Sequence, residues 1–137
     1  MRTISELATV LPLTRYDCEN WLKTLEFRRT HFQPASQGKA RLYTKEHAFV
    51  LGLLGAMVKG GALPSQAVLL AERVAQNWRM GRQNRWLVFA DGQFNSTSFS
   101  TNADAAYHAK ALKAITVSMI DLAKIQHRID DLFEVEA

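Results

Sequence analysis

The side chains in this sequence with the clearest chemical use are basic, polar and aromatic groups within the first 45 residues. Arg15, Tyr16 and Asn20 fall on the polar side of a predicted helix. From such a helix, arginine can read guanine and asparagine can read adenine in the major groove of DNA. Between 26 and 45 the chain carries five basic residues against one acid, and such side chains neutralise phosphates. The predicted DNA contacts are Thr14, Arg15, Tyr16, Asn20, Arg28, Arg29, Lys39, Arg41 and Tyr43.

A solvated helix face followed by a flexible basic loop accounts for the same residues without any ligand. Asp17 and Glu19 stand among the predicted contacts, and a carboxylate near a phosphate lowers affinity. These acids could instead accept hydrogen bonds from cytosine amino groups or exclude wrong sequences. A second basic cluster, interleaved with two tryptophans, is either a DNA-flanking patch or a rim of arginines around buried indoles; its members are Arg73, Trp78, Arg79, Arg82, Arg85 and Trp86.

Other reactive residue types predict neither catalysis nor a cofactor. Cys18 lies on the apolar side of its predicted helix, where a free cysteine behaves as a small hydrophobe. The four histidines show no metal-ligand spacing, and Gly60-Gly61 lacks the Lys-Ser/Thr of a phosphate-binding loop. The paired acids near residue 130 lack the burial that tunes a general acid. We therefore expect no enzyme activity, no metal and no cofactor.

Composition and charge narrow the class of protein. The chain has 137 residues, of which 47% are hydrophobic and 22% charged, which is typical of a folded globular protein and excludes a disordered or disulfide-rich one. The net charge of +4 is uneven: the first 45 residues hold eight basic and four acidic side chains, whereas residues 100–137 hold four and six. This gradient suits a protein that presents one end to a polyanion, although the charge alone fits many functions.

Helix signals divide the first 79 residues. Thr3 and Glu6 form a capping box for a helix over 3–10, and Thr14 is an N-cap for a second helix that ends near residue 25. The turn-forming residues at the centre of 26–45 predict a small hairpin, or wing. Thr44 caps an apolar helix over 45–58, and Pro64 begins a helix that continues to residue 79.

The remaining residues predict a hairpin and one long helix. Residues 86–90 have strand composition, Asp91-Gly92 is a turn pair, and 94–99 would return. A helix from 102 to 134 would carry a heptad seam typical of a homodimeric coiled coil, or would pack one face on its own hairpin. The predicted dimer interface is Leu112, Ile115, Met119, Leu122, Gln126, Ile129 and Phe133.

Several of these segments carry a family likeness. The Ile4-Ser5-Glu6-Leu7-Ala8 helix, the helix ending near Trp21, the Arg41-Leu42-Tyr43-Thr44 element and Gly60-Gly61 between two helices occur in that order. This arrangement resembles the MerR-type winged helix-turn-helix over residues 3 to about 75. The resemblance implies a dimer that binds duplex DNA sequence-specifically, with the second helix in the major groove and the wing beside the minor groove.

The chain departs from that family in four respects. Glu19 stands where these proteins commonly carry an arginine, so the phosphate contact made by that arginine is absent. The linker before the wing is long, a hairpin is inserted before the last helix, and the cysteines of metal-responsive members are missing. Excisionase-like small proteins share the same winged fold.

We therefore expect a mainly α protein with small β elements: a winged helix-turn-helix over 1–78, then a β-hairpin and a long dimerisation helix over 79–137. The expected function is a sequence-specific DNA-binding regulator of transcription that acts as a homodimer on a pseudo-palindromic site. Its partners would be double-stranded DNA, a second copy and RNA polymerase. The alternatives are an excisionase-like architectural factor and a protein-interaction module that has lost DNA binding. The longest apolar run is eleven residues and the single cysteine suits a reducing compartment, so we expect a cytoplasmic protein without a membrane span.

Overall fold

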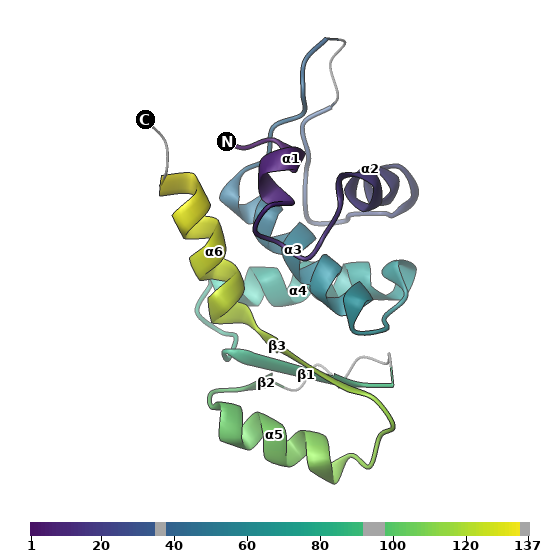
Figure 1. Ribbon diagram of the computed structural model, residues 1–137, viewed down its shortest axis with the longest axis vertical. Coiled ribbons are helices and arrows are strands. Elements are labelled where there is room, and N and C mark those ends of the chain that lie inside the picture. The colour runs from purple at the N-terminus through teal and green to yellow at the C-terminus, as the bar shows by residue number, and fades with distance from the viewer. Residues whose placement is uncertain (35–37, 92–97, 135–137) are drawn as a thin grey trace.

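The protein is mainly helical, with a small antiparallel sheet, as the sequence predicts (Figure 1). The computed structural model describes residues 1–34, 38–91 and 98–134. In chain order its elements are α1 (Ile4–Leu7), α2 (Arg15–Thr24), α3 (Lys45–Lys59), α4 (Pro64–Arg79), β1 (Trp86–Ala90), β2 (Ser98–Phe99), α5 (Asn102–Ala111), β3 (Val117–Asp121) and α6 (Leu122–Glu134).

The predicted N-caps are confirmed for the first three helices. The Thr3 hydroxyl accepts from the Glu6 amide, and the Glu6 carboxylate accepts from the Thr3 amide at 3.1 Å. Thr14 accepts from the Asp17 amide at 3.0 Å, and Thr44 starts α3. Each cap satisfies backbone donors that the first helical turn leaves free. The first helix is shorter than predicted, since α1 ends at Leu7.

The central helix α3 organises the core. One side of α3 packs on α4 and another packs on α6, and most of its residues between Ala48 and Met57 are buried. A Cβ at Gly55 would collide with the carbonyl oxygen of Pro12. Glycine at this position therefore lets the turn between α1 and α2 lie directly on α3.

The hairpin predicted after residue 85 belongs to a three-stranded sheet with the order β2-β1-β3. β1 and β2 pair antiparallel, with Trp86 opposite Phe99, as the hairpin prediction requires; 94–97 of the predicted return strand lie outside the described residues. β3 pairs along the whole of β1, and this strand was not predicted.

The prediction of one long helix over 102–134 is wrong. Helix α5 ends at Ala111, Lys113 adopts a positive φ of 55°, and the chain returns as β3 before α6 begins. Residues 115–120 include four β-branched side chains, which favour a strand. The Asp91 carboxylate also accepts from the amides of Ile115 and Thr116, which holds the chain in position to pair with β1.

The continuous dimer seam is wrong for the same reason. Ile115 lies in the loop before β3 and is 95% exposed, whereas Leu122 and Ile129 are fully buried in the core of their own chain, where α6 packs on α3. Gln126 accepts a hydrogen bond from the Trp78 indole at 3.2 Å. The predicted seam residues are therefore spread over the C-cap of α5, the following loop, β3 and α6: Leu112, Ile115, Met119, Leu122, Gln126, Ile129 and Phe133.

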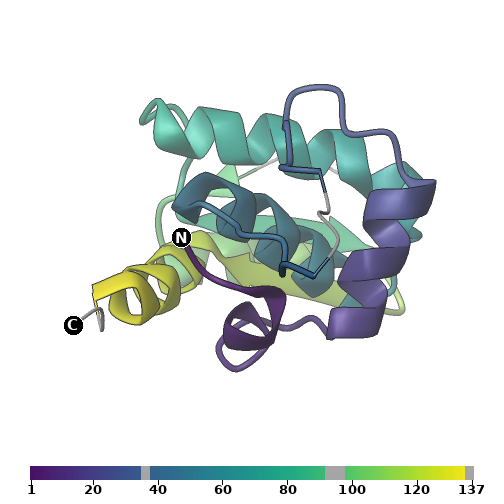
Figure 2. The ribbon, with the colours of Figure 1, turned by 90° about the horizontal axis from the view of Figure 1, so that it is seen from above.

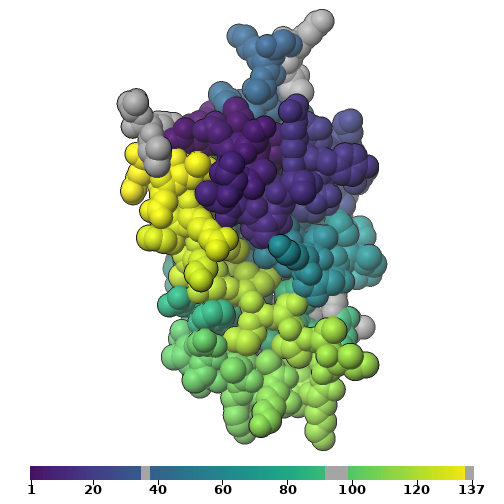
Figure 3. All heavy atoms as spheres, in the orientation of Figure 1, coloured from purple at the N-terminus to yellow at the C-terminus, as the bar shows by residue number. Residues whose placement is uncertain are grey.

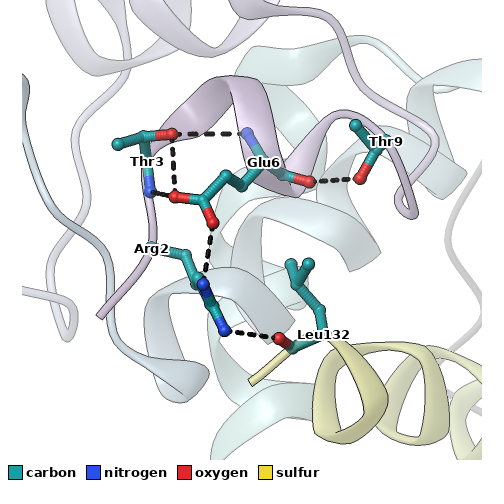
Figure 4. A network of polar contacts seen from close by, with 5 residues as sticks. All are labelled: Arg2, Thr3, Glu6, Thr9 and Leu132. Carbon is teal, nitrogen blue, oxygen red and sulfur yellow. Dashed lines mark hydrogen bonds and ion pairs between the residues drawn. The ribbon is translucent and has the colours of Figure 1, made fainter. Parts of the chain in front are cut away.

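The C-terminal helix is also fastened to the N-terminus (Figure 4). The Arg2 guanidinium donates to the Glu6 carboxylate at 2.9 Å and to the carbonyl oxygen of Leu132 at 2.8 Å. Figure 3 shows the resulting surface, on which α6 lies against the N-terminal residues. Leu87, Phe89 and Ile120 from the sheet join the same hydrophobic cluster as the N-terminal helices, so the segments 1–78 and 79–137 share one core.

Candidate nucleic-acid interface

A groove at one end of the molecule brings together three separate segments of the N-terminal half. It has a volume of about 540 Å³ and lies between the start of α1, the outer side of α2 and residues 39–43. Four basic side chains line this groove against one acid: Arg15, Lys23, Lys39, Arg41 and Glu19. A concave surface with this excess of positive charge can hold an anion such as a phosphate group.

The outer side of α2 carries the predicted base-reading residues. Tyr16 is 77% exposed and Asn20 is exposed as well, so both are accessible to a ligand. Arg15 is exposed but donates to the Glu19 carboxylate at 2.9 Å, one helical turn away. Exposed ion pairs of this kind are weak, about 0–1 kcal/mol, so a stronger acceptor can displace the carboxylate. Thr14 uses its hydroxyl to cap α2, and its role there is structural.

The predicted wing protrudes as a loop beyond α1 and α2 (Figure 1). Within its described residues the chain forms no strand, and 35–37 at its centre lie outside them. The backbone of Tyr43 instead pairs with Arg2, through hydrogen bonds of 2.8 and 3.0 Å. Among the described residues, the returning side of the wing is thus anchored to the N-terminus through Tyr43, and Lys39 takes part in a single β-bridge; the centre of the predicted hairpin lies outside these residues.

The prediction that the Tyr43 side chain contacts DNA is wrong. Its side chain is only 2% exposed, because it packs in the core beside Phe32 and His47. The Tyr43 hydroxyl accepts from the Cys18 thiol at 3.8 Å. Burial raises the pKa of Cys18 to about 11 and raises the pKa of Tyr43 as well, so both groups stay protonated and uncharged at neutral pH.

The leading side of the loop, residues 28–30, is held by a residue of α4 that the sequence analysis did not single out. Glu72 of α4 is 2% exposed, and its carboxylate accepts from the amides of Arg28 and Arg29 at 2.9 and 2.7 Å and from the Thr30 hydroxyl at 2.7 Å. An acid within the otherwise apolar side of α4 indicates an internal partner. Figure 2 shows this part of the loop passing over α4.

The basic residues predicted to contact phosphates differ in their exposure and in the groups that their side chains contact. Lys39 is exposed and Arg41 is half-buried at the groove. Arg28 makes only a long contact of 3.7 Å to Glu26, and the Arg29 guanidinium donates to the uncharged Gln76 amide at 2.6 Å. Apart from the long contact of Arg28, none of these four charges has a carboxylate within ion-pair distance among the described residues.

The second basic cluster separates into different environments. Arg79 pairs with Glu46 at 2.8 Å, and Arg85 makes two 2.9 Å hydrogen bonds to Asp121 while it lies over the Trp86 ring. Trp78 stacks on Phe49 in the core. Trp78 therefore matches the alternative of a packed indole, whereas Trp86 is half-buried with Arg85 over its ring. Arg73 differs, because it lies near Arg28 and Arg29.

No family model, curated protein or solved structure matches this chain. Among the described residues, no helix combines the length and apolar character needed to cross a membrane.

Proposed function

We propose that the protein binds double-stranded DNA in a sequence-specific manner and regulates transcription. The groove between α1, α2 and the returning side of the loop carries this proposal, since its basic side chains adjoin an exposed helix face with residues suited to reading bases. In this arrangement Arg15, Tyr16 and Asn20 contact base edges, whereas Lys39 and Arg41 contact phosphates. The resemblance to MerR-type proteins supports the same orientation of the second helix.

The experiment that tests this function is selection from random duplexes, followed by fluorescence anisotropy of selected and unselected duplexes between 50 and 200 mM salt. We expect the selected duplex to bind more tightly, with a log–log salt slope that is steeper by about 0.9 for each phosphate neutralised. Arg15→Gln should reduce the preference for the selected duplex, and Lys110→Gln, on exposed α5, is the matched control. A chain that captures no duplex at micromolar concentration in 50 mM salt would show the proposal to be wrong.

One observation favours a second candidate, a protein-interaction module. Glu19 already holds Arg15, and Asp17 lies on the same exposed helix, so α2 could instead present a mixed-charge surface to another protein. Such a module would show no salt-dependent duplex binding, and Lys39→Ala would leave any residual binding unchanged.

The proposed regulator would act in the cytoplasm as a homodimer, together with RNA polymerase. Because Leu122 and Ile129 of the predicted seam are buried in their own chain, the dimer requires another surface. Whether the protein is a dimer can be measured from the symmetry of the selected sequence and from the sedimentation of the free protein. A palindromic site indicates a dimeric regulator, whereas tandem repeats beside a recombination site would favour an excisionase-like factor.

A further inference from the structure

A second depression lies outside the groove of α2, between the leading side of the loop and α4. It has a volume of about 440 Å³, and its charged and polar lining consists of Arg28, Arg29, Arg73, Glu72 and Gln66. We call Arg28, Arg29 and Arg73 the arginine patch. Two of these residues lie on the leading side of the loop and the third comes from the middle of α4, so folding brings together charges that are 44 or more positions apart in the sequence.

The carboxylate of Glu72 does not neutralise the arginine patch through ion pairs. Both of its oxygens accept hydrogen bonds from the backbone amides of Arg28 and Arg29, and one also accepts from Thr30. Backbone donors satisfy the buried carboxylate while the guanidinium groups remain available. Glu72 thus fixes the backbone that carries two arginines next to the helix that carries the third.

The arginine patch also has few competing partners elsewhere. Arg28 is 3.7 Å from the exposed Glu26, Arg29 contacts the neutral Gln76 amide, and Arg73 forms no ion pair with any residue that the structure describes. Three guanidinium groups therefore share the depression with one lining carboxylate, Glu72, and Glu26 makes only a long contact to Arg28. Arginine is suited to phosphate because its planar group can donate two parallel hydrogen bonds to two oxygens.

We propose that the arginine patch binds phosphates of the DNA backbone, separately from the base-reading side of α2. This inference rests on the proposed function, because it assumes that a duplex lies along this end of the molecule. Arg28 follows the end of α2 by only four residues, so a duplex seated on α2 has backbone close to the patch. Phosphate contacts orient the protein and carry no sequence information, so the patch strengthens binding to every duplex by the same factor.

The test is Arg73→Gln, measured by anisotropy on both the selected and an unselected duplex between 50 and 200 mM salt. We expect both affinities to fall by the same factor and the salt dependence to become less steep by about 0.9. Arg28→Gln combined with Arg73→Gln should reduce the slope by about twice that amount. Arg82→Gln is the matched control, because Arg82 is exposed beyond the end of α4 and outside the depression.

The outcomes separate this inference from the proposed function. If Arg73→Gln behaves as Arg82→Gln does while Arg15→Gln weakens specific binding, the patch is wrong and the proposed function stands. If the wild type binds all duplexes equally and only Arg73→Gln alters the slope, sequence-specific binding is wrong and the patch stands. Wild-type protein that binds no duplex overturns both.

Two further measurements test the source of the phosphate and the role of Glu72. Inorganic phosphate that raises the melting temperature of the wild type but not of Arg73→Gln, with duplex binding unaffected by that substitution, would indicate a free-ion site and overturn the DNA assignment. If Glu72 positions the arginines, Glu72→Gln should make the salt dependence of duplex binding less steep, although the substitution removes no cation. An unchanged slope in folded Glu72→Gln protein would show that Glu72 only stabilises the fold.

Discussion

Two ends of the molecule, the loop end (residues 26–45 with α4) and the sheet end (β1, β2, α5 and β3), are each fastened by a carboxylate. The two carboxylates accept hydrogen bonds from different kinds of donor. At the loop end, Glu72 accepts from two backbone amides and a hydroxyl. At the sheet end, Asp121 accepts both of its short hydrogen bonds of 2.9 Å from the Arg85 guanidinium. Both arrangements hold a basic segment in place, and only the second uses the positive charge to do so.

This difference shows how a fold can position basic side chains without neutralising them. A carboxylate satisfied by backbone donors leaves neighbouring guanidinium groups free for a ligand, whereas a bidentate pair with arginine occupies that arginine. The loop end keeps Arg28, Arg29 and Arg73 available, and the sheet end does not offer Arg85. The position of an acid relative to the backbone thus decides which end can bind an anion.

The largest expected effect on this comparison comes from Glu72→Ala. The substitution leaves two backbone amides and one hydroxyl without their buried acceptor, and each such group costs about 1–3 kcal/mol. We expect the free energy of unfolding to fall by about 3 kcal/mol in urea denaturation. Gln66→Ala, an exposed position on the same helix, should change it by less than about 0.5 kcal/mol. A loss below about 1 kcal/mol for Glu72→Ala would mean that the leading side of the loop is not held by this carboxylate.

Asp121→Asn at the sheet end should cost less, about 1 kcal/mol, since Arg85 is half exposed and water can replace its partner. The hydrogen bonds from Arg85 lower the pKa of Asp121. A lowered pKa in the folded state means that this contribution is fully present above about pH 4 and is lost as the pH falls through the folded pKa. Urea denaturation between pH 2.5 and 7 measures it, and Asp121→Asn should flatten this dependence. An equal acid slope in both proteins would exclude the pair as its source.

Local signals in the sequence were sufficient for much of the loop end. The caps at Thr3, Thr14 and Thr44 depend on residues three positions away, and the structure has each of them. Glu72 was visible as an acid among apolar neighbours on α4, but its partners lie more than forty residues earlier in the chain. Since two of those partners are backbone amides, no pattern of side chains in the sequence predicts them. Arg28 and Arg29 were predicted as phosphate contacts, but their proximity to Arg73 of α4 could not be predicted, because it depends on the same distant contact.

The sheet end depends on distant pairing and was predicted less well. Residues 112–133 carry apolar side chains at intervals of three and four, which is typical of a helix, while 115–120 also have strand composition. The outcome depends on β1, about 30 residues earlier, whose edge β3 completes. Tyr43 illustrates the same limit: its residue type suits a DNA contact or a core position equally, and the pairing of its backbone with Arg2 turns it inward.

A smaller effect should come from His47, which connects the loop end to pH. Its Nδ1 atom accepts from the Thr44 amide at 3.2 Å, so the unprotonated ring completes the cap of α3, and burial lowers the pKa of His47. A histidine with a lowered folded pKa stabilises the protein above its unfolded pKa of about 6.5, and this contribution is lost as the pH falls through the folded pKa. We expect a change below about 1 kcal/mol in unfolding free energy between pH 7.5 and 5. His47→Gln keeps an acceptor at this position and should remove that part of the pH dependence, and a pH profile identical to that of the wild type would contradict the assignment.

The smallest expected effect concerns the one acid that lines the basic groove. Glu19 both holds Arg15 and adds a negative charge where a phosphate would lie. Glu19→Gln removes that charge, so we expect duplex affinity at 100 mM salt to rise by about threefold, with a steeper salt dependence. Glu134→Gln, a distant exposed acid on α6, controls for net charge. Anisotropy on selected and unselected duplexes distinguishes two roles for Glu19: a general gain indicates simple repulsion of phosphates, whereas a loss confined to the selected duplex indicates that Glu19 reads a base or aims Arg15 at one. No change on either duplex would place DNA away from this groove and would contradict the contacts proposed for α2.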